Sequence, residues 1–426
     1  MALCWPPDDP CAAPVIRIFL LLPLLVAAVL FLAGLETAPL VSRSASISPA
    51  SVAEARGLLL SNDPRRLRRG EQRTAQIPVA LIDEAFNHLA TRSLHGRGAF
   101  ALVDETGEFR FCVPVQLPGL SGARYLNLRA VFHAGGGRGQ AQLASASLGS
   151  LSIPPRLFEW LSVSVIEIAG LGEQWQLLRK AFRRLDFVPA RSAVAFTYVW
   201  EPGLLDRARA LAFTPADNQR VEAAQRALAS LLMNYPVNAR VPLSEVLPPL
   251  LAGPEGEETL QKRRAALLVL AAYESGKSLD ALFPQASDWP RPRRLKLELL
   301  GRYDSAQHFA ISAALAVWAG EPAANAIGVY KEIDDSRRGS GFSFADLAAD
   351  RAGTRFGELL LDDPARVNAA LRGSLRDSDL APPLGGLPEY LSAAQFERRY
   401  GGQDNPAYRQ VSADIEARVA ALPLYR

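Results

Sequence analysis

The chain has 426 residues, nearly half of them hydrophobic, with 47 basic and 44 acidic side chains and a formal net charge of +3. A chain of this length allows a sizeable core and about two or three domains, which excludes global disorder. The near-balanced charge argues against a dedicated nucleic-acid binder, because such proteins usually carry a strongly basic face. We therefore expect no nucleic-acid partner.

Cysteine is rare in this chain. Cys4 and Cys11 precede an apolar N-terminal segment, and Cys112 is alone after it. A disulfide inside the main body is therefore impossible, and no cysteine spacing typical of metal sites occurs.

A tail at residues 1–14 leads into an apolar segment, residues 15–36, that we interpret as a transmembrane anchor. Ile18 to Leu35 is free of charge, and Val15 and Ile16 bring the segment to about 20 residues, the length that spans a hydrocarbon core. A cleaved signal peptide is the alternative, but its apolar core is usually only ~7–15 residues long. The sequence thus predicts a single-pass inner-membrane protein, whose flanking charges set its orientation only weakly.

Residues 37–50 are polar and small, as in a juxtamembrane linker, and residues 51–201 predict an α+β domain. Helices are expected from Ala50 to Leu60 and from Ile82 to Leu94. Between them, the basic run from Arg65 to Arg69 is either a solvated face or a site of attraction to anionic lipid head groups.

Alternating side-chain character then predicts a meander of antiparallel strands with one buried face. The four alternating stretches cover residues 99–103, 109–115, 125–132 and 141–146. Leu157 to Phe182 predicts one long amphipathic helix, and Ser192 to Trp200 predicts a further strand. The expected fold class is therefore α+β, with the meander in the first domain of the body.

The remaining chain is helical in character. We expect a helical domain at residues 202–295, a three-helix motif segment at 296–362, and a C-terminal tail at 363–426 with two weak helical patches between Pro388 and Arg426. In the motif segment, Asp304 is a candidate N-cap that Gln307 completes as a capping box. Ser343 is the corresponding candidate cap of the third helix, with Asp346 at its third position.

Charged residues of the motif segment share helix faces. Glu332 and Asp335 are three residues apart, and Asp346 and Asp350 are four apart, so each pair lies on one face. Gly353 and Gly357 permit close helix contact. His308 follows Asp304 by one turn and is expected to lie on the same side of its helix.

Two interpretations of this segment stay open. In the first, caps and a buried ionic network between the helices account for its charges. In the second, it is a polar site, in which the oxygen ligands and one imidazole suit magnesium, manganese or zinc, and arginines hold a phosphate. The candidate catalytic residues are His308, Glu332, Asp335, Asp346 and Asp350. The candidate substrate-binding residues are Asp304, Lys331, Arg337, Arg338, Ser340 and Arg351.

The motif string resembles the YfiM-type family of predicted envelope lipoproteins over about 60 residues. The resemblance rests on Asp304-x-x-x-His308-Phe309, Gly328-x-x-Lys331-Glu332-x-x-Asp335-Ser336-Arg337, Gly339-Ser340-Gly341-Phe342-Ser343, Asp346-x-x-x-Asp350, Gly353 and Gly357. It is similar, more loosely, to the VanZ-like membrane family, where asparagine usually stands at the position of Asp350 and the helices are more hydrophobic. The stretches Tyr125-Leu-Asn-Leu and Leu148-Gly-Ser-Leu-Ser-Ile-Pro resemble anchored extracytoplasmic families of the YpmS type. These resemblances imply an envelope setting linked to cell-wall or lipid handling, with the body in the periplasm.

Three functions are compatible with these patterns. The first is an envelope protein that binds a lipid, such as an anionic lipid or cell-wall precursor, or a protein partner. The second is a metal-assisted hydrolase or transferase acting on a phosphate-bearing envelope lipid through His308, Glu332 and Asp346. The third is a structural scaffold. Standard catalytic motifs such as His-Glu-x-x-His and Gly-x-Ser-x-Gly are absent from the sequence.

Overall fold

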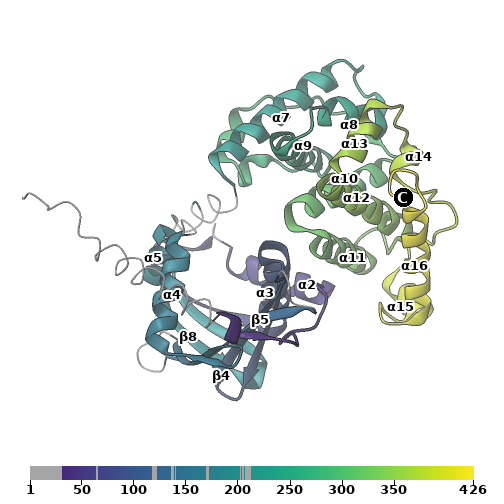
Figure 1. The fold of residues 1–426 in the computed structure, drawn as a ribbon. Helices are drawn as coiled ribbons and strands as arrows, with labels where there is room; N and C mark the ends of the chain where they lie inside the picture. The colour runs from purple at the N-terminus through teal and green to yellow at the C-terminus, as the bar shows by residue number, and fades with distance from the viewer. Residues whose placement is uncertain are drawn as a thin grey trace, which may run out of the picture. The chain divides into compact units, whose positions relative to one another are not determined.

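The computed structural model describes residues 31–63, 66–117, 122–135, 139, 141–168, 172–201, 203, 206 and 213–426. The chain divides into two compact units, one of Met1–Ala45 with Leu58–Glu201 and one of Ser46–Gly57 with Pro202–Arg426. The fold is mixed α+β, with antiparallel sheets in the first unit and mostly helices in the second (Figure 1), which confirms the predicted class. The predicted anchor lies largely outside the described residues. Within those residues, no helix has both the length and the apolar character needed to span a bilayer.

The first unit contains the predicted antiparallel meander. Its six-stranded sheet has the order β3-β4-β5-β6-β7, with the short β1 also paired to β5. The strands are β1 (Leu35–Glu36), β3 (Arg97–Val103), β4 (Thr106–Val115), β5 (Arg124–His133), β6 (Gln142–Leu148) and β7 (Leu151–Ile153). Helix α3 (Val79–Leu94) packs beside β3, where the Asn87 side chain accepts the backbone N–H of Gly98 at 3.1 Å. Strands β3 to β7 pair in chain order, as consecutive strands usually do.

A second, three-stranded antiparallel sheet has the order β2-β9-β8, in which only β9 (Ala193–Val199) was predicted. The other two strands are β2 (Gln72–Pro78) and β8 (Phe182–Val188). The long helix predicted from Leu157 to Phe182 is wrong at its C-terminal end. That stretch contains α4 (Pro155–Ile168) and α5 (Gly172–Ala181), and Phe182 already begins β8. Pairing with β9 favours the strand over the local pattern.

The second unit is built of helices, with one short parallel pair of strands, β10 (Arg240–Pro242) and β11 (Lys296–Glu298). Its main helices are α7 (Pro215–Met233), α8 (Leu243–Leu251), α9 (Glu257–Glu274), α10 (Tyr303–Ala319), α11 (Glu321–Arg338) and α12 (Phe344–Asp362). Helix α2 spans Pro49–Ser61. The two helical patches expected between Pro388 and Arg426 are α15 (Ala393–Tyr400) and α16 (Pro406–Ala420). Two further helices, α13 (Pro364–Arg372) and α14 (Asp377–Leu380), precede them.

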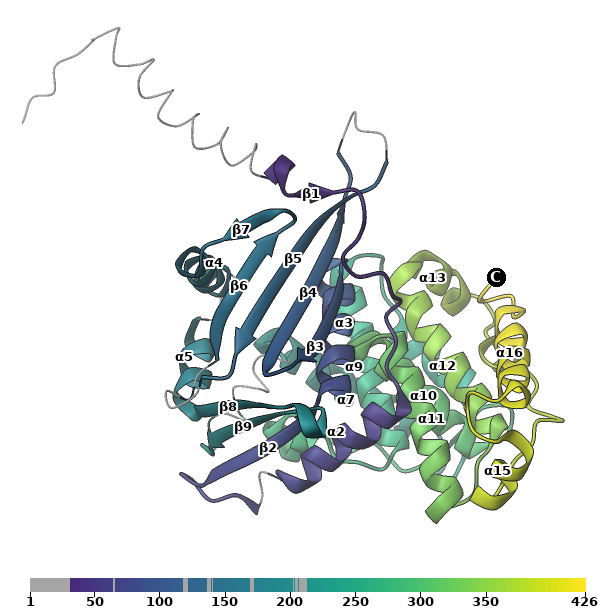
Figure 2. The same ribbon diagram turned by 90° about the horizontal axis from the view of Figure 1, so that it is seen from below.

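Helices α10 and α12 pack closely at the centre of the second unit (Figures 1 and 2). A Cβ at Gly353 would lie 2.2 Å from the carbonyl oxygen of Phe309, and one at Gly357 would lie 2.7 Å from that of Ala313. Any larger residue would force the helices apart, so the two glycines provide the close contact that their spacing predicts. Just N-terminal to this contact, the two helices place His308 opposite Asp350.

Candidate functional site

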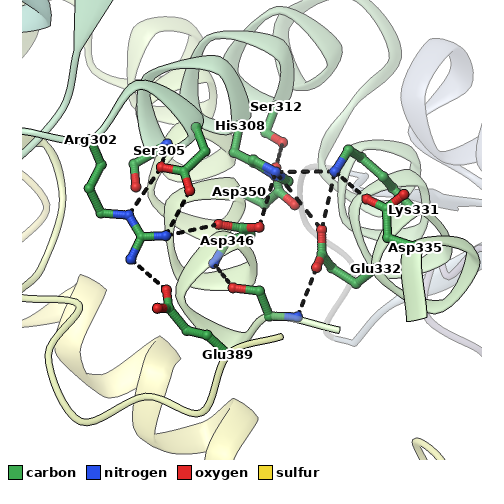
Figure 3. Close-up of polar contacts among 12 residues, drawn as sticks. Arg302, Ser305, His308, Ser312, Lys331, Glu332, Asp335, Asp346, Asp350 and Glu389 are labelled. Atoms are coloured by element: carbon green, nitrogen blue, oxygen red, sulfur yellow. Dashed lines mark hydrogen bonds and ion pairs between the residues drawn. The ribbon is translucent and has the colours of Figure 1, made fainter. Parts of the chain in front are cut away.

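Three helices bring the charged residues of the motif segment together (Figure 3). His308 on α10 places its Nδ1 3.1 Å from Oδ1 of Asp350 on α12. The same oxygen accepts a hydrogen bond of 2.7 Å from the hydroxyl of Ser312, one turn after His308. His308 and Asp350 are buried, at 4% exposure each. The Nδ1 edge of the imidazole is thereby held by Asp350, and Nε2 points to the other side of the site.

Side chains from α11 and α12 gather around Nε2 of His308. Lys331 Nζ lies 3.2 Å from Nε2, Asp346 Oδ2 lies 3.5 Å away and Glu332 Oε1 lies 3.9 Å away. Lys331 also contacts Oδ2 of Asp335 at 2.8 Å, nearer the surface. The Lys331 side chain is 43% exposed, whereas that of Glu332 is 1% exposed. The cluster is therefore buried at its centre and open to solvent along Lys331.

The start of α12 explains why Asp346 faces this cluster. Ser343 caps the helix as predicted, because its hydroxyl accepts the backbone N–H of Asp346 at 3.0 Å. The Asp346 side chain does not complete the predicted box. Instead, Oε2 of Glu332 accepts the backbone N–H of Ser343 at 3.0 Å. The carboxylate of Asp346 is thus free to turn toward His308.

The predicted capping role of Asp304 is wrong. Helix α10 begins two residues earlier than predicted, at Tyr303, and Gln307 donates to the backbone oxygen of Glu274 rather than completing a box. Asp304 instead binds Arg302 in two hydrogen bonds, of 3.0 and 2.7 Å. The ion pair with Arg302, two residues earlier, therefore prevails over capping of the helix by Asp304. The Arg302 bonds hold the pKa of Asp304 below its usual range, despite partial burial.

Other predicted substrate-binding residues do not converge on His308. Arg351 pairs with Glu416 on α16, at 3.0 Å, and Arg337 is exposed at the end of α11. Ser340 is exposed in the turn between α11 and α12. The backbone of Arg338 ends α11, and its side chain lies outside the described residues. Among the predicted binding residues whose side chains are described, Lys331 is the one whose charged group reaches the imidazole.

The structure adds three residues that sequence reasoning missed as members of the site. Ser312 bonds Asp350, Arg302 lies 3.8 Å from Oδ1 of Asp346, and Glu389 forms an ion pair of 2.5 Å with Arg302. The i, i+4 spacing of His308 and Ser312 was a usable signal for the first. No pattern links Arg302 to Glu389, because 87 residues separate them.

Burial and charge shift the proton affinities of the cluster. Burial alone would lower the pKa of His308, but the charge and hydrogen bond of Asp350 outweigh it and raise the pKa to about 9. Burial raises the pKa of Glu332 to about 7 and also raises that of Asp346. The Lys331 ammonium can donate only to an unprotonated Nε2, which opposes the effect of the carboxylates. The carboxylates prevail, because three of them surround the ring.

The arrangement fits a divalent cation. His308, Glu332 and Asp350 each offer one ligand atom, and these atoms lie within 4.8 Å of one another. Oδ2 of buried Asp350 and Oδ1 of Asp346 have no hydrogen-bond partner among the described residues. A Cβ at Gly328 would lie 2.8 Å from Oδ2 of Asp350, so glycine makes room for that oxygen beside α11. Unpaired carboxylate oxygens next to an imidazole are the donors that manganese or zinc accepts.

We compared the chain with known protein families, curated proteins and solved structures. No protein-family model, no curated protein and no solved structure matches the chain. The resemblance to the YfiM-type and VanZ-like families therefore stays a prediction from the motif residues.

Proposed function

We propose that the helical unit binds a divalent metal through His308, Glu332 and Asp350, and that this centre serves a hydrolase or transferase acting on a phosphate-bearing envelope lipid. The observation that carries the proposal is the convergence of three ligand atoms within 4.8 Å, one of them on a residue whose second oxygen lacks a partner. A buried ionic network alone would leave that acceptor unsatisfied, which is costly. A metal ion satisfies it.

The residues around the metal have distinct roles in this proposal. A divalent ion held by these residues would supply Lewis-acid chemistry, which makes a water molecule more acidic. Asp346 lies 3.5 Å from Nε2 of His308, where its carboxylate could accept a proton as a general base. Ser312 orients Asp350, as partners of metal ligands commonly do.

Lys331 has a separate role, because its ammonium occupies the region that the cation would take. A metal at His308 would require Nε2 to be unprotonated and would repel the Lys331 ammonium 3.2 Å away, so the lysine would turn outward. Its exposed side chain and its partner Asp335 lie on the solvent side. In that position Lys331 meets an anionic substrate at the mouth of the site, as a phosphate group requires.

The test compares metal content and turnover in the full chain and two near-isosteric variants, Glu332→Gln and Asp350→Asn. After equilibration with manganese or zinc, native mass spectrometry counts bound metal, and hydrolysis of bis(p-nitrophenyl) phosphate reports turnover. We expect one metal in the wild type, and folded variants that lose both metal and turnover. A wild type that takes up neither ion contradicts the metal centre. Metal without turnover would support binding and contradict catalysis.

We infer the cellular setting from the N-terminal sequence. The charge-free run from Ile18 to Leu35 supports a single-pass anchor in the inner membrane, and the motif resemblance supports a periplasmic body that meets an anionic lipid, a cell-wall precursor or an envelope protein. Protease accessibility of the full chain in spheroplasts tests this setting. Protection of the body in intact spheroplasts contradicts the periplasmic orientation, and recovery in the soluble fraction contradicts the anchor.

A further inference from the structure

Helix α4 of the first unit presents an apolar face to solvent. Leu157, Trp160 and Leu161 follow the i, i+3, i+4 spacing of one helix face, and they are 46%, 64% and 41% exposed. A different side of the helix contacts the sheet, where the ring of Phe158 lies 6.4 Å from that of Phe132. The exposed face is therefore distinct from the one that α4 uses to join the core.

The turn that leads into this helix lies close in space to the end of the apolar N-terminal run. The turn between β6 and β7 lies against Gly34, since a Cβ at Gly149 would be 2.3 Å from the Gly34 carbonyl oxygen. Strand β1 follows Gly34. It pairs with the start of β5, just before the part of β5 that pairs with β6. Figure 2 shows β1 and the β6–β7 turn at the same end of the six-stranded sheet, with α4 alongside β6. Helix α4 begins two residues after β7.

Side chains at the end of the run have the same character as the face on α4. Phe31 and Leu32 are 37% and 52% exposed where the apolar run enters the first unit. Trp175 on α5 adds a second partly exposed indole, and the last turn of α5 carries exposed Arg179 and Lys180. Tryptophan and leucine beside basic residues form the composition of helices that lie in the interfacial zone of a bilayer.

We propose that the exposed face of α4 lies in the head-group region of the membrane that the N-terminal segment enters. This inference rests on the proposed membrane anchor and is independent of the proposed metal chemistry. The occupant is a phospholipid bilayer surface, because the apolar run ends at Gly34, against the turn that leads through β7 into α4. The helix would give the first unit a second attachment and thereby fix its orientation at the membrane.

Depth-dependent quenching in vesicles tests the proposal. The full chain is reconstituted into vesicles of zwitterionic and anionic phospholipid with or without brominated acyl chains, and recovered by flotation. We expect brominated lipid to quench tryptophan emission, and Trp160→Phe to lose a distinct part of this quenching. Trp318→Phe is the matched control, because Trp318 packs within the second unit against Arg264 and should leave the quenching unchanged.

Each outcome bears on the proposal. Floated protein in which Trp160→Phe and wild type are quenched equally overturns the docking of α4 while leaving the anchor intact. Protein that does not float with the vesicles overturns the anchor and this inference together. A detergent-solubilised dimer that Trp160→Asp converts to a monomer assigns the face to a second copy of the chain and also overturns it.

Discussion

Glu332 on α11 accepts the backbone N–H of Ser343, the residue that caps α12, at 3.0 Å. In an ordinary capping box, the side chain at the third helical position would take that N–H, and here this is Asp346. Because Glu332 takes it, Asp346 faces His308 instead. One buried carboxylate thus joins two helices and leaves a second carboxylate available for chemistry.

Two substitutions at Glu332 separate its structural bond from its charge. Glu332→Gln keeps an oxygen that can accept from Ser343, so we expect a folded protein. Its metal affinity should fall by more than the ~10–100-fold loss that follows mutation of a residue that only hydrogen-bonds a metal ligand. Glu332→Ala leaves a buried N–H unsatisfied and should lower the free energy of unfolding by about 1–3 kcal/mol. Urea denaturation and a competition titration with a metal indicator measure the two effects. Unchanged metal affinity in the glutamine variant would exclude Glu332 as a ligand.

Metal binding should depend on pH through the protons that it displaces. The pKa of Glu332 is raised to about 7 and that of His308 to about 9, and both must be deprotonated to bind a metal. As the pH increases, we expect the metal affinity to rise steeply up to pH 7, less steeply from pH 7 to 9, and little above pH 9. Calorimetry in buffers of different protonation enthalpy counts the released protons. A constant proton count from pH 6 to 9 would contradict this.

The same shift of His308 affects the stability of the metal-free protein with a defined sign. Its pKa is 6.5 when unperturbed and about 9 in the folded chain, so the folded state holds the proton more tightly. The resulting stabilisation is full below pH 6.5 and is lost as the pH rises through 9. Metal binding and proton binding therefore compete, and added metal should stabilise the protein most at alkaline pH.

Local patterns in the sequence were sufficient to predict part of the site. The cap at Ser343, the shared face of Asp346 and Asp350, and the close contact at Gly353 depend on spacing within one helix, and all three occur in the structure. The strands of the meander were equally predictable, because the alternation of apolar and polar side chains within each strand indicates them. What a residue does within one or two helical turns is visible in the sequence.

Contacts between distant segments were not predictable in the same way. Arg302 binds Asp304 and Glu389, and the second of these lies beyond the motif segment. Pairing with β9 makes Phe182 to Val188 a strand, although its local pattern continued a helix. Tyr425 donates to the backbone oxygen of Leu380 at 2.8 Å, which packs the C-terminal stretch onto the helical unit. In each case a tertiary partner determines the outcome, and its position follows only from the fold.

Lys331 can be tested as a competitor of the metal. Lys331→Met removes the ammonium that lies 3.2 Å from Nε2 of His308 but keeps the length of the side chain. We expect tighter metal binding, because no cation has to be displaced, together with slower turnover of a phosphodiester. Arg337→Met is the matched control, since Arg337 is exposed near the end of the same helix and should leave both quantities unchanged. Weaker metal binding in Lys331→Met would exclude competition.

A buried acid outside the site gives a prediction independent of function. Glu274 at the end of α9 is 1% exposed, and neither of its carboxylate oxygens has a hydrogen-bond partner among the described residues. Burial raises its pKa to about 8, and the charge of Arg294 offsets this only in part. The side chain is therefore largely protonated at pH 7, in contrast to its state in an unfolded chain.

Because the folded chain holds this proton more tightly, Glu274 lowers stability as the pH rises. Between pH 4.5 and about 8, it should remove about 1.4 kcal/mol from the free energy of unfolding per pH unit. Glu274→Gln removes this dependence, so its stability advantage over wild type should be small at pH 5 and largest at pH 8 and above. Glu257→Gln, on the exposed first turn of the same helix, is the control that should follow wild type. Urea denaturation at pH 5, 7 and 9 decides the question. If the free energies of unfolding of Glu274→Gln and wild type change in parallel with pH, the pKa of Glu274 in the folded protein is an ordinary one.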